Sequence, residues 1–187
     1  SRKAEDGKPM TKRKNNRKTG EAARFASLYG VLIALAMVLS YVETLIPLPM
    51  LVPGAKLGLA NLVTVVGLFL VGIPGTVCIT VFRVVLAGLT FGNVYSMAYG
   101  LSGSFLSLFV MASVKKSGLF GQTGISGLGG VAHNIGQLTF AAFLVRTAGV
   151  FSYLPMLLAA GCIAGTVIGL LGGILTKRLE KFVKNLH

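Results

Sequence analysis

The chain has 187 residues, of which 53% are hydrophobic and 12% are charged, and its mean hydropathy is +0.77. These values exclude an ordinary soluble domain and indicate an integral membrane protein. The net charge of +13 does not indicate a nucleic-acid partner, because nine of the eighteen Lys and Arg residues lie between Arg2 and Arg24, with no interleaved aromatic residue before Phe25.

The N-terminal residues 1–21 form a basic tail in front of a predicted membrane domain over residues 22–187. Residues 1–9 precede a Met and are left out of the fold prediction. A basic segment beside a membrane helix stays on the cytoplasmic side and can contact anionic lipid. The first apolar run is long and follows this tail, so it is predicted to be a retained helix rather than a cleaved signal peptide.

Six apolar runs follow, against a requirement of about 20 residues per membrane span. They cover residues 24–46, 57–72, 74–91, 94–114, 123–146 and 151–176. The second and third runs are short, so one bent helix is the alternative count. Six spans would put both basic ends of the chain, and the loop with Lys115 and Lys116, on the cytoplasmic side. We therefore predict an all-α, multi-pass bundle of six transmembrane helices in the lipid bilayer of the cell membrane, with both termini in the cytoplasm.

Two of the predicted helices carry small residues at every fourth position. The first has Ala22, Ala26, Gly30 and Ala34, and the last has Gly161, Gly165, Gly169 and Gly173. Small residues let helix backbones approach closely within a membrane. The stripes either pack these helices inside the monomer or dock another membrane subunit.

The loop after the first helix contains Pro47, Pro49 and Pro53, which cannot lie together in a regular helix. Polar residues flank this loop in an otherwise apolar region: Glu43 before it, Lys56 at its end, and Asn61 early in the next run. Such groups are costly in a membrane unless they are paired or hydrated. The pattern predicts the mouth of a small-molecule site.

Arg83 lies close to the middle of the third predicted helix. Either it forms a structural pair with Glu43 or with helix-end carbonyls, or it contacts a ligand. Asn93, which is predicted to cap the outer end of this helix or the start of the next, is a further candidate, as are His133, Asn134 and Gln137 of the fifth helix. The alternative for the last three is hydrogen bonding between helices. We expect these residues to converge with Lys56 and Asn61 on a cavity that opens to the outside.

Several kinds of chemistry are excluded by residues that the chain lacks. It has no P-loop motif, its only aspartate is Asp6 in the tail, and no clustered carboxylates could hold Mg-diphosphate. His133 has no second ligand at metal spacing, and Cys78 and Cys162 are expected to be packing residues. We predict no enzyme activity, no metal and no cofactor.

Four sequence stretches resemble one family. They are Ser40-Tyr-Val-Glu with Ile46-Pro-Leu-Pro, Pro53-Gly-Ala-Lys-Leu-Gly-Leu-Ala-Asn61, Arg83 with Gly88-Leu-Thr-Phe-Gly92, and Val131-Ala-His-Asn-Ile-Gly-Gln137. Together they are similar to the bacterial Gx transporter family, often labelled heptaprenyl diphosphate synthase component I. That family is grouped with the S components of energy-coupling factor (ECF) transporters, six-helix proteins that bind vitamins from outside.

This resemblance implies a substrate-binding subunit that captures a vitamin-like or anionic molecule for ATP-driven transport. It implies that Ala26, Gly30 and Ala34 dock a transmembrane coupling subunit driven by ATPase subunits, and that residues 47–56 close over the ligand. The alternative function is a membrane accessory subunit of a prenyl diphosphate synthase, in isoprenoid or quinone biosynthesis. A third possibility is an assembly subunit that binds no ligand.

Overall fold

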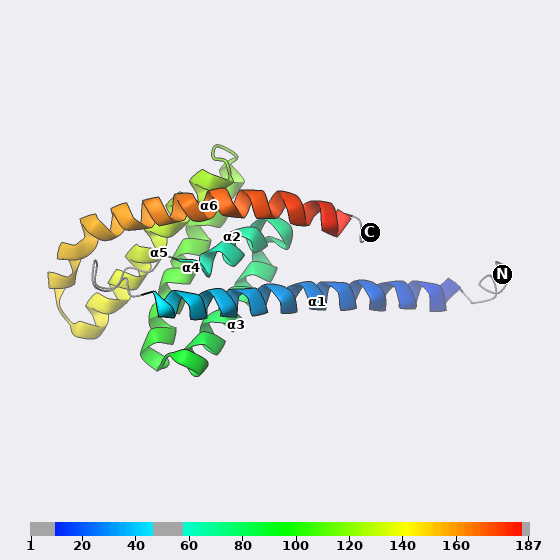
Figure 1. Cartoon of the computed structure of the whole chain (residues 1–187), viewed down its shortest axis with the longest axis horizontal. Helices are drawn as coiled ribbons and strands as arrows, with labels where there is room; N and C mark the ends of the chain where they lie inside the picture. The colour runs from blue at the N-terminus through cyan, green and yellow to red at the C-terminus, as the bar shows by residue number, and fades with distance from the viewer. Residues whose placement is uncertain (1–9, 47–57, 185–187) are drawn as a thin grey trace.

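The computed structural model of the chain describes residues 10–46 and 58–184, and in these ranges the protein is entirely helical. The elements in Figure 1 are α1 (Met10–Leu45), α2 (Asn61–Leu70), α3 (Gly72–Phe91), α4 (Val94–Ser117), α5 (Gln122–Val145), the 3₁₀ helix η2 (Ala148–Tyr153) and α6 (Leu154–Lys184). Helix α1 runs without a break through the predicted tail boundary at residue 21. The three loop prolines and Lys56 lie outside the described residues.

The prediction of a helical membrane protein is confirmed, but the prediction of six complete spans is not. Five helices in the described ranges have an apolar stretch long enough to cross a membrane, whereas α2 has only ten residues. At about 1.5 Å per residue, α2 covers about 15 Å, which is about half of a hydrocarbon core of about 30 Å. The second apolar run is therefore a short core helix.

Helix α2 is buried on all sides in the middle of the bundle. Its residues 63–68 are all buried, and it packs against α1, α3 and α6. Gly72, with a φ of 76°, reverses the chain directly after α2. A Cβ at Gly67 would lie 3.2 Å from Oγ1 of Thr76, so α2 and α3 lie side by side. The alternative of a single bent helix is therefore wrong.

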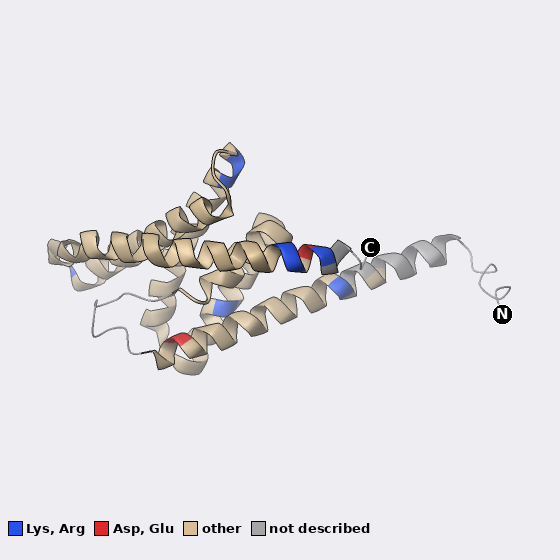
Figure 2. Cartoon of the chain, turned by 45° about the horizontal axis from the view of Figure 1, so that its top comes forward, with Lys and Arg blue, Asp and Glu red and all other residues tan. Residues whose placement is uncertain are grey.

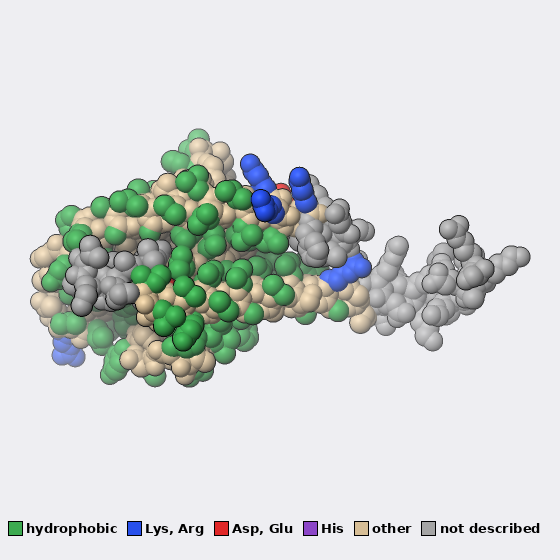
Figure 3. Space-filling view, in the orientation of Figure 1, with side chains coloured by type: hydrophobic (Ala, Val, Ile, Leu, Met, Phe, Trp, Pro, Cys, Tyr) green, Lys and Arg blue, Asp and Glu red, His purple; other side chains and the backbone are tan. Residues whose placement is uncertain are grey.

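The long helices place both ends of the described chain at one end of the molecule. Helices α1 and α6 run along opposite sides of the bundle, and the start of α1 lies at the same end as the finish of α6 (Figure 1). Blue Lys and Arg residues mark that end of both helices in Figure 2. Figure 3 shows hydrophobic side chains spread over the visible face between the two ends, as expected for a surface in contact with lipid.

Glycines bring α4 and α5 close enough for their polar residues to share a space. A Cβ at Gly103 would lie 2.6 Å from Cγ of Gln137, and a Cβ at Gly136 would lie 2.7 Å from the carbonyl oxygen of Ser102. Both distances are too short for a real side chain, so only glycine permits this approach. The hydroxyl of Ser102 donates to the carbonyl of Gly136 at 3.1 Å across the same contact.

Candidate functional site

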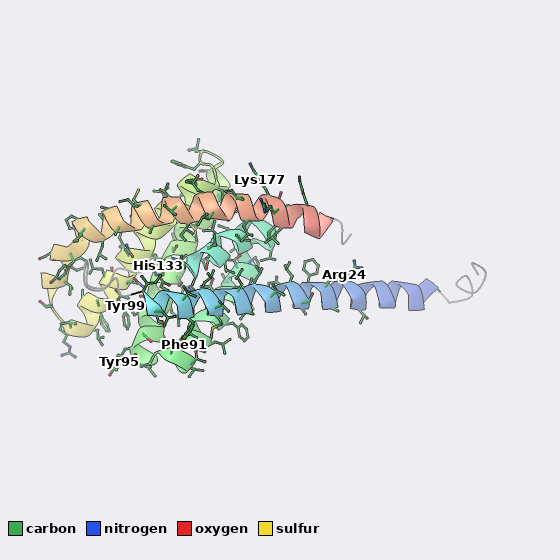
Figure 4. The ribbon with its side chains drawn as sticks, in the orientation of Figure 1. Arg24, Phe91, Tyr95, Tyr99, His133 and Lys177 are labelled. Carbon is green, nitrogen blue, oxygen red and sulfur yellow. The ribbon has the colours of Figure 1, made fainter. Side chains whose placement is uncertain are left out.

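A cavity of about 270 Å³ lies between α1, α3, α4 and α5, next to the first turn of α2. Its polar lining residues are Ser40, Glu43, Thr44, Asn61, Arg83, Ser96, Ser104, His133 and Gln137. Figure 4 shows two residues of this region, His133 and Phe91, far from Arg24 and Lys177, which mark the basic end. The volume is at the lower limit of ligand pockets, about 300–1,000 Å³, so the cavity suits a small molecule.

Arg83 extends from α3 into the wall of this cavity and is only 8% exposed. One terminal nitrogen of its guanidinium donates to Oγ of Ser104 on α4 at 3.2 Å. Its Nε is buried and has no hydrogen-bond partner among the described residues. A guanidinium has five N–H donors. The described residues engage one of its nitrogens, so most of the donor capacity that they leave faces the cavity that Arg83 lines.

Glu43 reaches the same cavity from the last turns of α1. Its carboxylate accepts a hydrogen bond from the backbone N–H of Gly58, in the turn that leads into α2. Glu43 interacts electrostatically with Arg83, but no hydrogen bond or ion pair joins them in the described part of the chain. The sequence indicated Glu43 or helix-end carbonyls as structural partners of Arg83. For Glu43, the described structure shows an electrostatic interaction without direct contact.

The predicted amide and imidazole residues divide between this cavity and a smaller one beneath it. Asn61, His133 and Gln137 line the main cavity, and Gln137 is only 2% exposed. Asn134 lines the smaller cavity of about 30 Å³, whose wall also includes Asn61 and His133. That volume has room for about two waters, at about 10–15 Å³ each. The Nδ2 of Asn134 donates to the carbonyl of Leu157 at 2.7 Å, so this residue also joins α5 to α6.

Among the described residues, Asn93 is a predicted site residue that does not line the main cavity. Asn93 is the N-cap of α4: its side chain accepts from the N–H of Ser96, and Oγ of Ser96 accepts in return from the N–H of Asn93. The predicted cap is therefore confirmed, at the start of the helix that follows, and Asn93 is not among the described residues that line the main cavity. Lys56 and the predicted gate over residues 47–56 lie outside the described residues.

The structure adds lining residues that the sequence prediction did not include. Ser104 is the partner of Arg83, and Ser40 and Ser96 line the cavity from α1 and α4. Serines are frequent in packed membrane helices, so the sequence held no signal that singled these out. Phe91 lines the cavity and packs against Tyr41 with ring centroids 5.4 Å apart, which links α1 to α3 beside it.

The described residues contain no group of three His, Cys, Asp or Glu side chains that could hold a metal ion. The cavity combines one guanidinium, one carboxylate, several hydroxyls and two amides with apolar walls. Such a set can bind and orient a polar molecule through charge and hydrogen bonds. It lacks the clustered carboxylates that hold magnesium at a diphosphate.

The predicted docking residues lie on α1 before Ser40, the first residue of this helix that lines the cavity. Ala26, Gly30 and Ala34 are all exposed, and a Cβ at Gly30 would have no heavy atom within 4 Å in the described structure. The stripe of α6 is different, because Gly161, Gly165 and Gly169 are buried. The small residues of α1 are therefore uncovered by the described chain, whereas those of α6 pack inside it.

Comparison with known proteins identifies one family. The model of the family described as heptaprenyl diphosphate synthase component I matches residues 32–175, which span the helices from α1 to α6. No curated protein and no solved structure matches the chain.

Proposed function

The chain belongs to the heptaprenyl diphosphate synthase component I family, and on that premise we propose that it is a membrane subunit that binds a small polar or anionic molecule in its main cavity. The observation that carries the proposal is Arg83, a buried cation whose Nε has no hydrogen-bond partner among the described residues and which lines that cavity. The expectation that the chain is not itself an enzyme agrees with the family description, which names one component of a synthase.

The position of Arg83 makes a purely structural role expensive. It is eleven residues into the twenty-residue α3, close to the middle of the predicted span. Arginine at that depth costs about 2.5–3.5 kcal/mol on insertion scales, and such residues face a bundle interior or a hydrated cavity. Among the described residues, one hydrogen bond to Ser104 leaves most of its donors unused. An acceptor group of a bound molecule would satisfy them, with Asn61 and Gln137 orienting it.

The experiment is to identify what co-purifies with the protein and then to change Arg83. Mass spectrometry of the purified protein should find a small polar molecule, and Arg83→Gln should weaken its binding at least tenfold, which corresponds to about 1.4 kcal/mol. Arg146→Gln is the matched control, because Arg146 is exposed at the end of α5. If the purified protein carries no ligand, and Arg83→Gln only lowers its stability, Arg83 is structural and the proposal fails.

A prenyl diphosphate synthase is the first candidate partner, and the family description favours it. The chain would then be a membrane accessory subunit, and it would not need the magnesium-binding carboxylates of the catalytic chain. Co-purification with a catalytic prenyl synthase chain at near-equal amounts is the expected result. A prenyl synthase activity that is unchanged by adding or removing this chain would exclude this partner.

An ATP-driven transport module is the second candidate partner, and the exposed stripe of α1 favours it. The chain would capture a vitamin-like molecule from outside and pass it on through a transmembrane coupling subunit and ATPase subunits. The same purification, with the proteins identified by mass spectrometry, separates the two candidates. Recovery of an ATPase together with a second membrane protein supports transport, and recovery of neither partner class leaves the chain as an independent ligand-binding protein.

The proposal places both termini in the cytoplasm. Arg24 and Lys177 lie at the same end of the molecule in Figure 4, and basic residues favour the cytoplasmic side. Single cysteines at Ser117 and Ser152, both exposed, test this in a background without Cys78 and Cys162. A membrane-impermeant maleimide added to intact cells should label position 152 and not position 117. The reverse pattern would invert the topology.

A further inference from the structure

Two side chains of opposite charge face the main cavity without pairing with each other. Arg83 comes from the middle of α3 and Glu43 from the last turns of α1. They interact electrostatically, but neither a hydrogen bond nor an ion pair joins them among the described residues. The attraction of opposite charges is stronger in a low-dielectric interior than in water. Arg83 and Glu43 would be expected to form an ion pair in such an interior, so a local contact must keep the two side chains separated.

The backbone of the turn before α2 holds the carboxylate away from Arg83. The N–H of Gly58 donates to Oε1 of Glu43, and Gly58 has a φ of 72°, a conformation that glycine adopts readily. The carbonyl of Gly58 in turn accepts from the N–H of Asn61 at 2.8 Å, which ties this turn to the start of α2. This hydrogen bond engages one oxygen of Glu43 with the backbone of that turn rather than with Arg83.

Both charged groups keep unused hydrogen-bonding capacity. A carboxylate has about four lone-pair positions, and one accepted bond is found for Glu43 in the described structure. For Arg83, one of five donors is used by Ser104, and Nε is buried without a partner in the described ranges. The cavity therefore offers acceptors at Glu43 and donors at Arg83.

This arrangement disfavours ligands that carry a single charge. A carboxylate or phosphate placed on Arg83 would be repelled by Glu43, and an amine placed on Glu43 would be repelled by Arg83. A ligand with both kinds of group satisfies both side chains. The cavity of about 270 Å³ limits such a ligand to a small size.

We propose that the ligand is an amphoteric small molecule, with an anionic or accepting group on Arg83 and a cationic or donating group on Glu43. This proposal rests on the proposed function, namely that the cavity binds a ligand, and adds its chemical class. Glu43 thereby acts as a specificity-determining residue, because it selects against molecules that offer only negative charge.

The test uses matched probes that differ only in their charged groups. Straight-chain α,ω-amino acids of three to six carbons are compared with the carboxylates and the amines of the same lengths, on purified full-length protein in detergent. Binding is measured by the rise in thermal midpoint with probe concentration. At least one amino acid should bind tenfold more tightly than both of its matched single-charge probes.

Variants assign this preference to the two side chains. Glu43→Gln keeps an acceptor for the N–H of Gly58 but removes the charge, so the preferred amino acid and its matched carboxylate should bind equally. Arg83→Gln should remove the advantage of the amino acid over the matched amine. Glu180→Gln is the control, because Glu180 is an exposed acid in the last turns of α6, and it should change neither ratio.

The outcomes separate this inference from the proposed function. Equal binding of amino acids and carboxylates to the unaltered protein overturns the inference that the ligand is amphoteric. The proposal of an anion-binding cavity would then still stand. An unchanged preference in Glu43→Gln also overturns it. If no probe binds and no molecule co-purifies, both the inference and the proposed function fail.

Discussion

Helices α1 and α6 carry the same pattern of small residues at every fourth position, but residues 10–46 and 58–184, which the structure describes, cover only the stripe of α6. On α6, a Cβ at Gly165 would lie 2.6 Å from the carbonyl oxygen of Ser126, and a Cβ at Gly161 would lie 2.7 Å from that of Gly130. On α1, a Cβ at Gly30 would meet nothing within 4 Å in the described structure. The pattern indicates that a helix can be approached closely, but it does not say which helix approaches.

The difference comes from the helices that face each stripe. Helix α5 has glycines of its own, Gly127 and Gly130, so α5 and α6 meet where neither has a side chain in the way. Helix α1 packs on α2 and α3 through another face, which includes Leu32 and Ala36 at 3% and 0% exposure. Ala36 lies two residues, about 200°, around the helix from Ala34. The stripe of α1 therefore points away from the bundle.

The largest expected effect is on the buried stripe. Gly165→Val should destabilise the protein by about 3 kcal/mol or more, because overpacking costs about 1–3 kcal/mol and here the new atoms would meet backbone that cannot move aside. Unfolding in mixed micelles, followed by circular dichroism, measures the change. Gly30→Val is the matched control and should stay within about 0.5 kcal/mol of the original chain. Similar losses for both variants would remove the contrast between the stripes.

A smaller effect is expected for the hydrogen bond across the same helix contact. Asn134→Ala removes the bond to the carbonyl of Leu157 and should cost about 0.6 kcal/mol, the mean measured for hydrogen bonds between membrane helices, and no more than about 1.7 kcal/mol, the largest such value. The same unfolding assay applies. Thr139→Ala is the control on α5, because Thr139 is exposed and its hydroxyl donates within its own helix, to the carbonyl of Ile135. A loss for Asn134→Ala no larger than that of the control would assign the contact to glycine packing alone.

The smallest effect on stability is expected for the exposed stripe of α1. Gly30→Leu should change the free energy of unfolding by less than about 0.5 kcal/mol, because the added side chain enters open space. Assembly with a partner subunit should nevertheless be lost, while binding of the co-purifying ligand is retained. Size-exclusion chromatography of the complex and mass spectrometry of the ligand measure both. Loss of ligand and partner together would show that the stripe packs within the monomer.

Most ends of the predicted apolar runs lie close to helix ends, but α1 begins fourteen residues before its run, α6 continues to Lys184, and the second run differs most. The fourth run, predicted over residues 94–114, is α4 (Val94–Ser117), and its ends follow from the cap at Asn93 and the left-handed Gly118, with a φ of 69°. The second run, predicted over residues 57–72, yields only ten helical residues. Hydropathy reports how apolar a segment is, and a buried core helix is as apolar as a membrane span.

The sequence predicted the site residues whose burial in a membrane carries a large free-energy cost. Glu43, Asn61, Arg83, His133 and Gln137 stood out as polar residues in apolar segments, and the structure places all five around one cavity. Asn93 was predicted both to cap a helix and to join the site. It caps α4, because an asparagine just before a helix can accept a hydrogen bond from the helix backbone, and it is not among the described residues that line the main cavity. The serines that line the cavity cost little free energy when they are buried, so the sequence did not single them out.

The sequence by itself determined the class of protein, the places where its apolar segments lie, and the polar residues within them that need partners. Each of these depends on the transfer free energy of a residue and its neighbours along the chain, which is a local property. Only the tertiary structure decided that Arg83 and Glu43 face one cavity without pairing, and that the stripe of α6 is covered while that of α1 is not. Those outcomes depend on which helices pack together and on how each helix is rotated about its axis. Contacts between residues that are distant in the sequence determine both.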